Sequence, residues 1–386
     1  TLWENNIDRF KYYPFFSISL YFISSILLFY AFSAYGLNTK AASSISFGLI
    51  FSNSLVLYGN NIHPELLSIS LIIFSIAGAI LMSTKANKFL TMLFTALCVS
   101  CAYLIKPAFI TFFIFTPLIY YFLDYTNKNR LRWTMILFIL SSASFFTVSI
   151  FRYQILGDFN LVSFGGYQMT GIAGLMVNKG LALLLPMEMA DSANYIIDKK
   201  DFLIKNLSIQ AIPKNSYGEV SFISAALGYF DILARNYDSI VYGIIGDLKM
   251  PNETWVEFNA RMQSFSIEVI SSKPIYYFSW VVGASARFMG RIIVINLPLM
   301  LSIIGLISAL LISRSGKKVI GFNLNKKELI CLIIIPLIYT FSSGIFSILV
   351  SFPASRYIDT SGIMLSGFFI FVIQLILDEN SRIYNQ

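Results

Sequence analysis

The sequence has little charge, little cysteine and almost no histidine. Only 12% of its 386 residues are Asp, Glu, Lys or Arg, whereas soluble chains carry about 25%. The three cysteines, Cys98, Cys101 and Cys331, lie inside apolar runs. This placement excludes a disulfide scaffold and favours core positions. Two neighbouring cysteines and one histidine are too few for a zinc site.

The chain is instead rich in apolar residues. Hydrophobic residues make up 56% of the chain and aromatic residues 16%. A helix needs about 20 mainly apolar residues to cross a bilayer. Runs of this kind predict nine spans, at 14–36, 41–60, 64–82, 89–105, 107–123, 133–151, 290–313, 328–350 and 360–377. A weaker run, 274–289, is expected to lie at the membrane interface. The expected fold class is therefore all-α, a polytopic transmembrane helical bundle.

No run between 152 and 273 is long enough to span, which predicts a large, mainly helical insertion. The expected organisation is an N-terminal group of transmembrane helices (1–151), the insertion (152–273), and an interfacial segment with C-terminal transmembrane helices (274–386). Helices are expected over 217–239 and 254–271. The second opens with Thr254 and Glu257, the spacing of a capping box.

Glycines punctuate the segment 157–174 at the start of the insertion. Their spacing predicts a turn-rich loop that displays Tyr167. Such a loop allows close backbone approach to a sugar or a phosphate. A surface turn without a ligand is the alternative, and no Gly-Lys-Ser/Thr follows that would indicate a P-loop.

The net charge of +8 is sorted to one side of the predicted bundle. Alternate connections on that side hold 12 of the 28 basic residues and 4 of the 20 acidic residues, a balance of +8. Positive loops lie in the cytoplasm, so the insertion is expected outside and the C-terminus inside. Because the surplus is explained by topology, and no basic patch is interleaved with aromatics, nucleic-acid binding is not expected.

Two basic residues at the outer membrane boundary, Lys106 and Arg356, do not follow the positive-inside rule. His63, Glu65 and Asp359 lie at the same boundary, where four predicted spans start or end. Each has an ordinary explanation, such as a snorkelling lysine or an acid at a helix N-terminus. Together they fit a site for an anionic headgroup, since Lys and Arg bind phosphate through charge-assisted hydrogen bonds. Arg287 is close to the same boundary and extends the basic set.

Four segments give the chain a resemblance to a known family. They read HPELLSISLIIFSIAGAIL, AYLIKPAFI, SSKPIYYFSWVVGASARF and SFPASRYID in chain order. In order, spacing and sidedness the chain resembles the polytopic GT-C glycosyltransferases, in particular bacterial members that are similar to dolichyl-phosphate-mannose mannosyltransferases. The resemblance covers most of 14–377.

The resemblance implies a transferase in the bacterial inner membrane that acts on the extracytoplasmic face. It would move a sugar from a polyprenyl-phosphate-linked donor to a lipid, glycan or protein acceptor. The positions that match the family's phosphate-binding bases are Lys106 and Arg356, and Arg287 is a further candidate for phosphate binding. The candidate substrate-binding residues are His63, Tyr357, Asp359 and Tyr167. Glu65 matches an acidic loop position and is the candidate general base. A divalent cation, Mg²⁺ or Mn²⁺, is a candidate cofactor for these acids. The family often has an acidic motif in this loop, whereas this chain has His63-Pro64-Glu65 and not a pair of acids.

The family's main catalytic acid usually lies in the first outer loop. This chain starts at Thr1 without a methionine, and the sequence is expected to be an N-terminally truncated fragment of the family pattern. Glu4 and Asp8 are the acids that remain before the first predicted span, and both are candidate catalytic residues. Three other functions stay open: a polysaccharide polymerase or O-antigen ligase, a transporter or flippase for lipid-linked sugars, and a membrane scaffold without catalysis.

Overall fold

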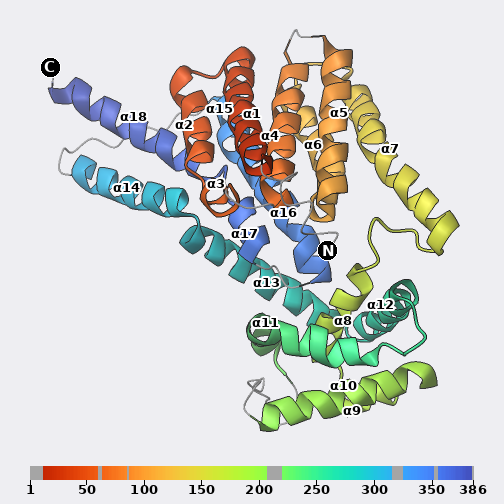
Figure 1. The fold of residues 1–386 in the computed structure, drawn as a ribbon. Helices are drawn as coiled ribbons and strands as arrows, with labels where there is room; N and C mark the ends of the chain where they lie inside the picture. Colours follow the sequence, from red (N-terminus) through yellow and green to blue (C-terminus); the bar gives the residue numbers. More distant parts are fainter. Residues whose placement is uncertain are drawn as a thin grey trace. The chain divides into compact units, whose positions relative to one another are not determined.

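The computed structural model describes residues 12–59, 63–84, 87–206, 220–314, 325–351 and 355–384. Every regular element in these ranges is a helix (Figure 1). The chain divides into two compact units. Unit 1 comprises Thr1–Phe146, Arg291–Gly344 and Ser355–Gln386, and unit 2 comprises Thr147–Gly290 and Ile345–Ala354.

Six helices of the described residues are long and apolar enough to cross a membrane. They are α1 (Tyr13–Tyr35), α4 (Pro64–Met82), α5 (Lys88–Ile105), α7 (Arg130–Leu156), α13 (Pro274–Ile295) and the continuous run Lys326–Val350. That last run joins α15 (Lys326–Leu329), the π-helix η5 (Ile330–Ile334) and α16 (Ile335–Val350). The helical, membrane-embedded class is therefore supported, while the nine predicted spans are not all present as such.

Three of the predicted spans are interrupted. The run 41–60 is divided into α2 (Thr39–Ile50) and α3 (Asn53–Tyr58), because the Tyr21 hydroxyl bonds to both the Leu49 carbonyl (2.7 Å) and Ser52 Oγ (2.8 Å) at the break. The run 290–313 breaks at Asn296, whose side chain accepts from the amide of Leu299 and caps α14 (Leu297–Arg314). A side-chain acceptor at this position ends one helix and starts the next.

The third interruption lies in 360–377, which is shared between α17 (Ser355–Ser361) and α18 (Ser366–Tyr384). A turn closed by the Leu365 amide and the Gly362 carbonyl separates them. The segment 274–289, which is predicted to lie at the membrane interface, also differs from the prediction. It forms the first part of α13, one apolar helix that continues to Ile295.

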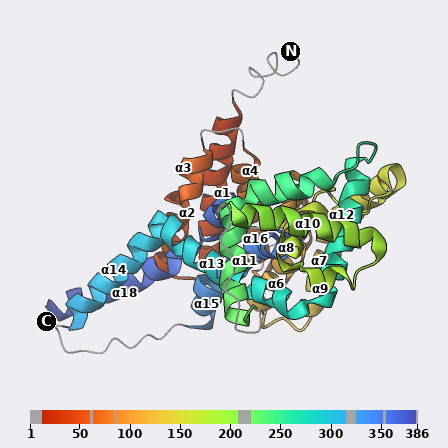
Figure 2. The ribbon, with the colours of Figure 1, turned by 90° about the horizontal axis from the view of Figure 1, so that it is seen from below.

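The core of unit 1 is built around α4, which packs against α1, α5 and α6 (Phe112–Leu123). α4 is the most buried of the six candidate spans. A short 3-10 helix, η2 (Pro107–Thr111), connects α5 to α6. Within the same unit, α14 and α18 lie side by side in both views (Figures 1 and 2).

Unit 2 contains the helices of the insertion. They are α8 (Gly165–Met176), α9 (Lys179–Ala182), α10 (Met187–Lys205), α11 (Phe222–Tyr237), η3 (Asp238–Ile245), η4 (Gly246–Leu248) and α12 (Trp255–Ser272). The predicted helices at 217–239 and 254–271 match α11 and α12, and the Thr254–Glu257 capping box is confirmed. The predicted loop 157–174 is wrong from Gly165 onward, since α8 begins there and packs against α12.

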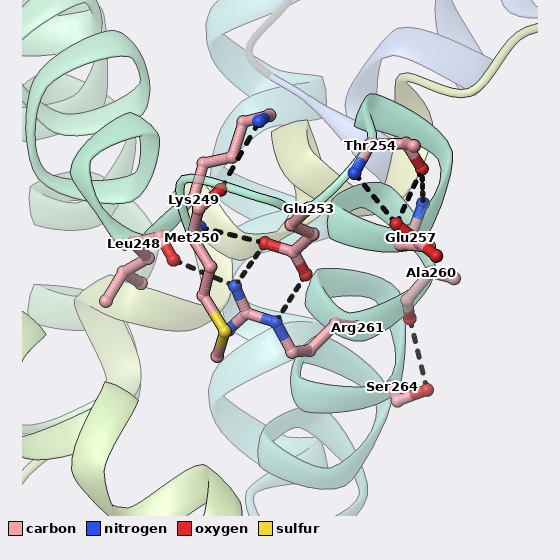
Figure 3. Close-up of polar contacts among 9 residues, drawn as sticks. All are labelled: Leu248, Lys249, Met250, Glu253, Thr254, Glu257, Ala260, Arg261 and Ser264. Atoms are coloured by element: carbon pink, nitrogen blue, oxygen red, sulfur yellow. Dashed lines mark hydrogen bonds and ion pairs between the residues drawn. The ribbon is translucent and has the colours of Figure 1, made fainter.

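An ion pair closes the loop that leads into α12 (Figure 3). Arg261 donates from Nε to Glu253 Oε1 and from a terminal nitrogen to Oε2, both at 2.8 Å. The same terminal nitrogen donates to the Leu248 carbonyl, and Glu253 Oε2 also accepts from the Met250 amide. Such two-point pairing fixes geometry as well as charge, so the pair links the end of η4 to the first turns of α12.

Candidate functional site

A buried ion pair joins the start of α4 to the end of α5. Lys106 Nζ lies 3.4 Å from Glu65 Oε1, and both side chains are less than 10% exposed. Pro64 starts α4 and places Glu65 in its first turn, where the helix dipole favours a carboxylate. Lys106 ends α5 in an extended conformation (φ −134°, ψ 97°), as expected for a residue before proline. The sequence thus fixes both residues at one end of the antiparallel pair of helices.

A second buried carboxylate lies in the same part of unit 1. Asp359 of α17 accepts a hydrogen bond at Oδ2 from the Tyr58 hydroxyl of α3 (3.1 Å), and its carbonyl accepts from Ser54 (2.9 Å). α17 packs on α3 and α4. Burial raises the pKa of Asp359 above its usual range, while the Tyr58 hydrogen bond and the charge of Lys106 act to lower it. Asp359 therefore lies within the electrostatic reach of Lys106.

His63 is the exposed member of the group. Its Nδ1 lies 3.8 Å from Glu65 Oε2, and its side chain is 56% exposed. The Tyr13 hydroxyl donates to its carbonyl (2.8 Å), and its ring meets the Tyr58 ring edge to face. His63 is exposed and Glu65 is buried, so the imidazole lies between the buried carboxylate and the protein surface. We call Tyr58, His63, Glu65, Lys106 and Asp359 the Glu65–Lys106 cluster.

The cluster combines two buried acids with one buried ammonium. Glu65 Oε2 accepts no hydrogen bond among the described residues. A buried oxygen without a donor is costly unless a ligand or solvent satisfies it. The Lys106 ammonium is also 5.4 Å from the Phe109 ring centroid. The arrangement can accept a proton at Glu65 and attract an anionic group at Lys106.

The structure brings together four of the candidate residues, His63, Glu65, Lys106 and Asp359, as their common boundary position predicts. Glu4 and Asp8 lie outside the described residues. Arg356 and Tyr357 belong to α17, but their side chains lie outside the described part of the structure. Their contribution stays a prediction.

Two further candidates belong to unit 2. Arg287 on α13 forms an ion pair with Asp231 on α11 (2.8 Å). Tyr167 is not displayed as predicted. It is 3% exposed and packs against Phe164, Tyr242, Trp255 and Phe258. The glycines around it permit close helix packing, because a Cβ on Gly166 would overlap the backbone of α12.

Tyr58 and Tyr13 are not among the residues predicted for the site. Tyr58 lies in the apolar run 41–60 and Tyr13 immediately precedes the run 14–36, and a tyrosine in or beside such a run is ordinary. Only the break before α3 and the fold of α17 onto α3 bring the Tyr58 hydroxyl to Asp359. For the divalent cation, no group of three His, Cys, Asp or Glu side chains occurs within the ranges that the structure describes.

Comparisons with protein-family models, with curated proteins and with solved structures find no match for this chain. The features that indicate a function are the Glu65–Lys106 cluster and the apolar helices that carry it.

Proposed function

We propose that this protein is an integral membrane glycosyltransferase that moves a sugar from a polyprenyl-phosphate-linked donor to an acceptor. The observation that carries the proposal is the buried Glu65–Lys106 pair at one end of apolar helices. A lipid-linked donor requires apolar helices for its tail and a cation for its phosphate. The positive-inside pattern supports the extracytoplasmic face of a bacterial inner membrane as the place of reaction.

In this proposal Lys106 binds the donor phosphate. The C–O bond between the anomeric carbon and the phosphate oxygen breaks, and its electron pair leaves with the phosphate. Negative charge then grows on the phosphate oxygens beside the ammonium. A fixed cation in a buried site stabilises such charge far better than water does. Arg356, on the same helix as Asp359, is the second cation proposed for this role.

Glu65 serves as the general base. Its Oε2 has no donor among the described residues and is therefore able to take the proton of the acceptor hydroxyl. The acceptor oxygen then attacks the anomeric carbon as the phosphate leaves. A positioned base of this kind contributes about 10²–10⁴-fold to rate. His63, partly exposed beside Glu65, offers the path by which that proton reaches solvent.

The test is transfer of a radiolabelled sugar from a polyprenyl-phosphate donor by the full chain in proteoliposomes. Glu65→Gln keeps the size of the side chain and removes the base, so we expect a loss of at least about 100-fold in kcat. Lys106→Ala is expected to abolish transfer, and Lys106→Arg is expected to retain part of it, because the positive charge remains.

Lys88→Ala is the matched control. Lys88 lies at the other end of α5 and pairs with Asp124 (3.1 Å), so its removal also breaks an ion pair of this helix. The control is expected to transfer sugar like the unaltered protein. Full activity in both Glu65→Gln and Lys106→Ala, with equal amounts inserted in the membrane, would contradict the proposal. Movement of the intact donor across the bilayer without a covalent product would instead identify a flippase.

A further inference from the structure

A cavity of about 770 Å³ lies in unit 1 where three helices end. α1 ends at Tyr35, α4 at Met82 and α6 at Leu123, and residues from each of these ends line it. Lys327 of α15 lines it as well. This volume falls in the range of small-molecule sites, about 300–1,000 Å³. None of its lining residues belongs to the Glu65–Lys106 cluster.

One wall of the cavity consists of hydrogen-bond acceptors. The hydroxyls of Ser83 and Thr84 donate back to the carbonyls of α4, at 2.6 and 2.7 Å, so their oxygens are oriented to accept. Asp124, at the end of α6, is 5% exposed. The negative ends of the α4 and α6 dipoles add to its charge. Lys88 already pairs with Oδ2 of Asp124, so this wall offers acceptor oxygens and helix C-terminal dipoles to a further N–H donor rather than an unpaired charge.

Asp124 is held in place by three donors. Lys88 Nζ, the Tyr120 hydroxyl and Asn127 Nδ2 bond to it at 3.1, 2.6 and 2.8 Å. All three bonds end on Oδ2, so the carboxylate has a fixed orientation. A preorganised acceptor loses little entropy when a ligand binds.

A cation and aromatic rings also line the cavity. Lys327 Nζ donates to the Tyr35 carbonyl (2.9 Å) and lies 5.0 Å from the centroid of the Tyr35 ring. The capping box between Asn325 and Glu328 fixes the turn that carries Lys327. Tyr30 on α1 also lines the cavity and is 62% exposed. Tyrosines of this kind favour the level of lipid headgroups.

We propose that this cavity binds the headgroup of an ethanolamine phospholipid. The ammonium of such a headgroup has three N–H donors for the wall of Asp124, Ser83 and Thr84, and tyrosine rings attract a cation. Its phosphate is joined to the ammonium by two carbons, and Lys327 lines the same cavity and supplies the cation for it. A glycerol headgroup supplies no cation, and a choline headgroup supplies no N–H donor. The acyl chains extend from the cavity along the apolar surface of the helices.

The experiment is native mass spectrometry of the full chain after reconstitution with equal amounts of phosphatidylethanolamine, phosphatidylglycerol and phosphatidylcholine. We expect the ethanolamine lipid to be retained preferentially. Lys327→Ala is expected to lower its retention by about tenfold, the effect of losing one hydrogen bond to a charged group. Lys40→Ala is the control, because Lys40 is an exposed lysine that pairs with Asp378 and does not line the cavity.

The proposal is wrong if the three lipids are retained equally, or if Lys327→Ala retains the ethanolamine lipid as Lys40→Ala does. A third arm adds soluble glycerophosphoethanolamine as competitor. The lipid is expected to stay bound, and displacement at equal concentration would overturn the lipid assignment. A circular dichroism spectrum and thermal midpoint for each variant identify a folding defect. If Lys327→Ala fails to fold, Tyr30→Ala replaces it, and unchanged retention in that variant contradicts the proposal.

Discussion

At the scale of single residues, the Glu253–Arg261 pair gives the clearest electrostatic effect. Hydrogen bonds from Arg261 hold the pKa of Glu253 below its usual value, and burial opposes them. A carboxyl whose pKa is lowered on folding stabilises the protein above its unfolded pKa, about 4.3. That stabilisation disappears as the pH falls through the lower, folded pKa.

We therefore expect the free energy of unfolding to decrease as the pH falls below about 4.3, and Glu253→Gln to flatten that decrease. Chemical denaturation in detergent at a series of pH values measures it. Glu257 needs its own variant, because the Thr254 backbone and side chain lower its pKa too. If the free energy of unfolding depends on pH equally in Glu253→Gln and in the unaltered protein, Glu253 does not cause the loss of stability in acid.

The site residues that could be predicted from the sequence are those that interrupt the apolar pattern of the predicted spans. Glu65 and Lys106 are charges at the ends of apolar runs, on the side where the positive-inside rule expects few bases, and the structure places them 3.4 Å apart. Tyr58 was not predictable, because its role depends on where α17 packs on α3. A hydroxyl in an apolar run gives no sequence signal until its partner is known.

At the scale of elements, a close crossing in unit 2 depends on one glycine. A Cβ on Gly283 of α13 would overlap the carbonyl of Ala226 on α11. Gly290 lies on the same helix, and a Cβ there would meet nothing within 4 Å. The two glycines allow a matched comparison within α13.

We expect Gly283→Ala to destabilise the protein by about 1–3 kcal/mol or more, because two backbones must separate. Gly290→Ala is expected to be neutral or to stabilise by up to about 1 kcal/mol, since alanine favours a helix. Thermal midpoints of the two variants in the same detergent measure the difference. Equal midpoints would show that α11 and α13 do not approach as closely as described.

Elements were predictable where a long apolar run or a capping box determines them. The run 64–82 matches α4, and Thr254 with Glu257 marks the start of α12. The breaks at Ser52 and Asn296 were not predicted, because a contact from α1 or a local cap ends each helix without changing its apolar composition. Apolar periodicity indicates that a segment is buried in lipid or protein, not whether it is continuous.

At the scale of the whole molecule, the sorting of charge predicts the orientation in the membrane. Asn252, in the insertion, is expected outside, and Lys40 is expected in the cytoplasm. Single cysteines at these positions, in a chain without its three native cysteines, are tested with a membrane-impermeant maleimide. We expect Asn252→Cys to react in intact cells and Lys40→Cys only after permeabilisation. Labelling of both in intact cells would contradict the predicted orientation.

The division into two units has a consequence for how the chain can be cut. Three of its four boundaries, at Phe146, Gly290 and Gly344, fall inside α7, α13 and α16, and the fourth, at Ala354, lies outside the described residues. Proteases cleave exposed loop tips and rarely cleave within a helix. Three uninterrupted helices therefore carry the chain from one unit to the other. Unit 2 is consequently not a detachable module, and neither limited digestion nor genetic shuffling at loops would release it intact.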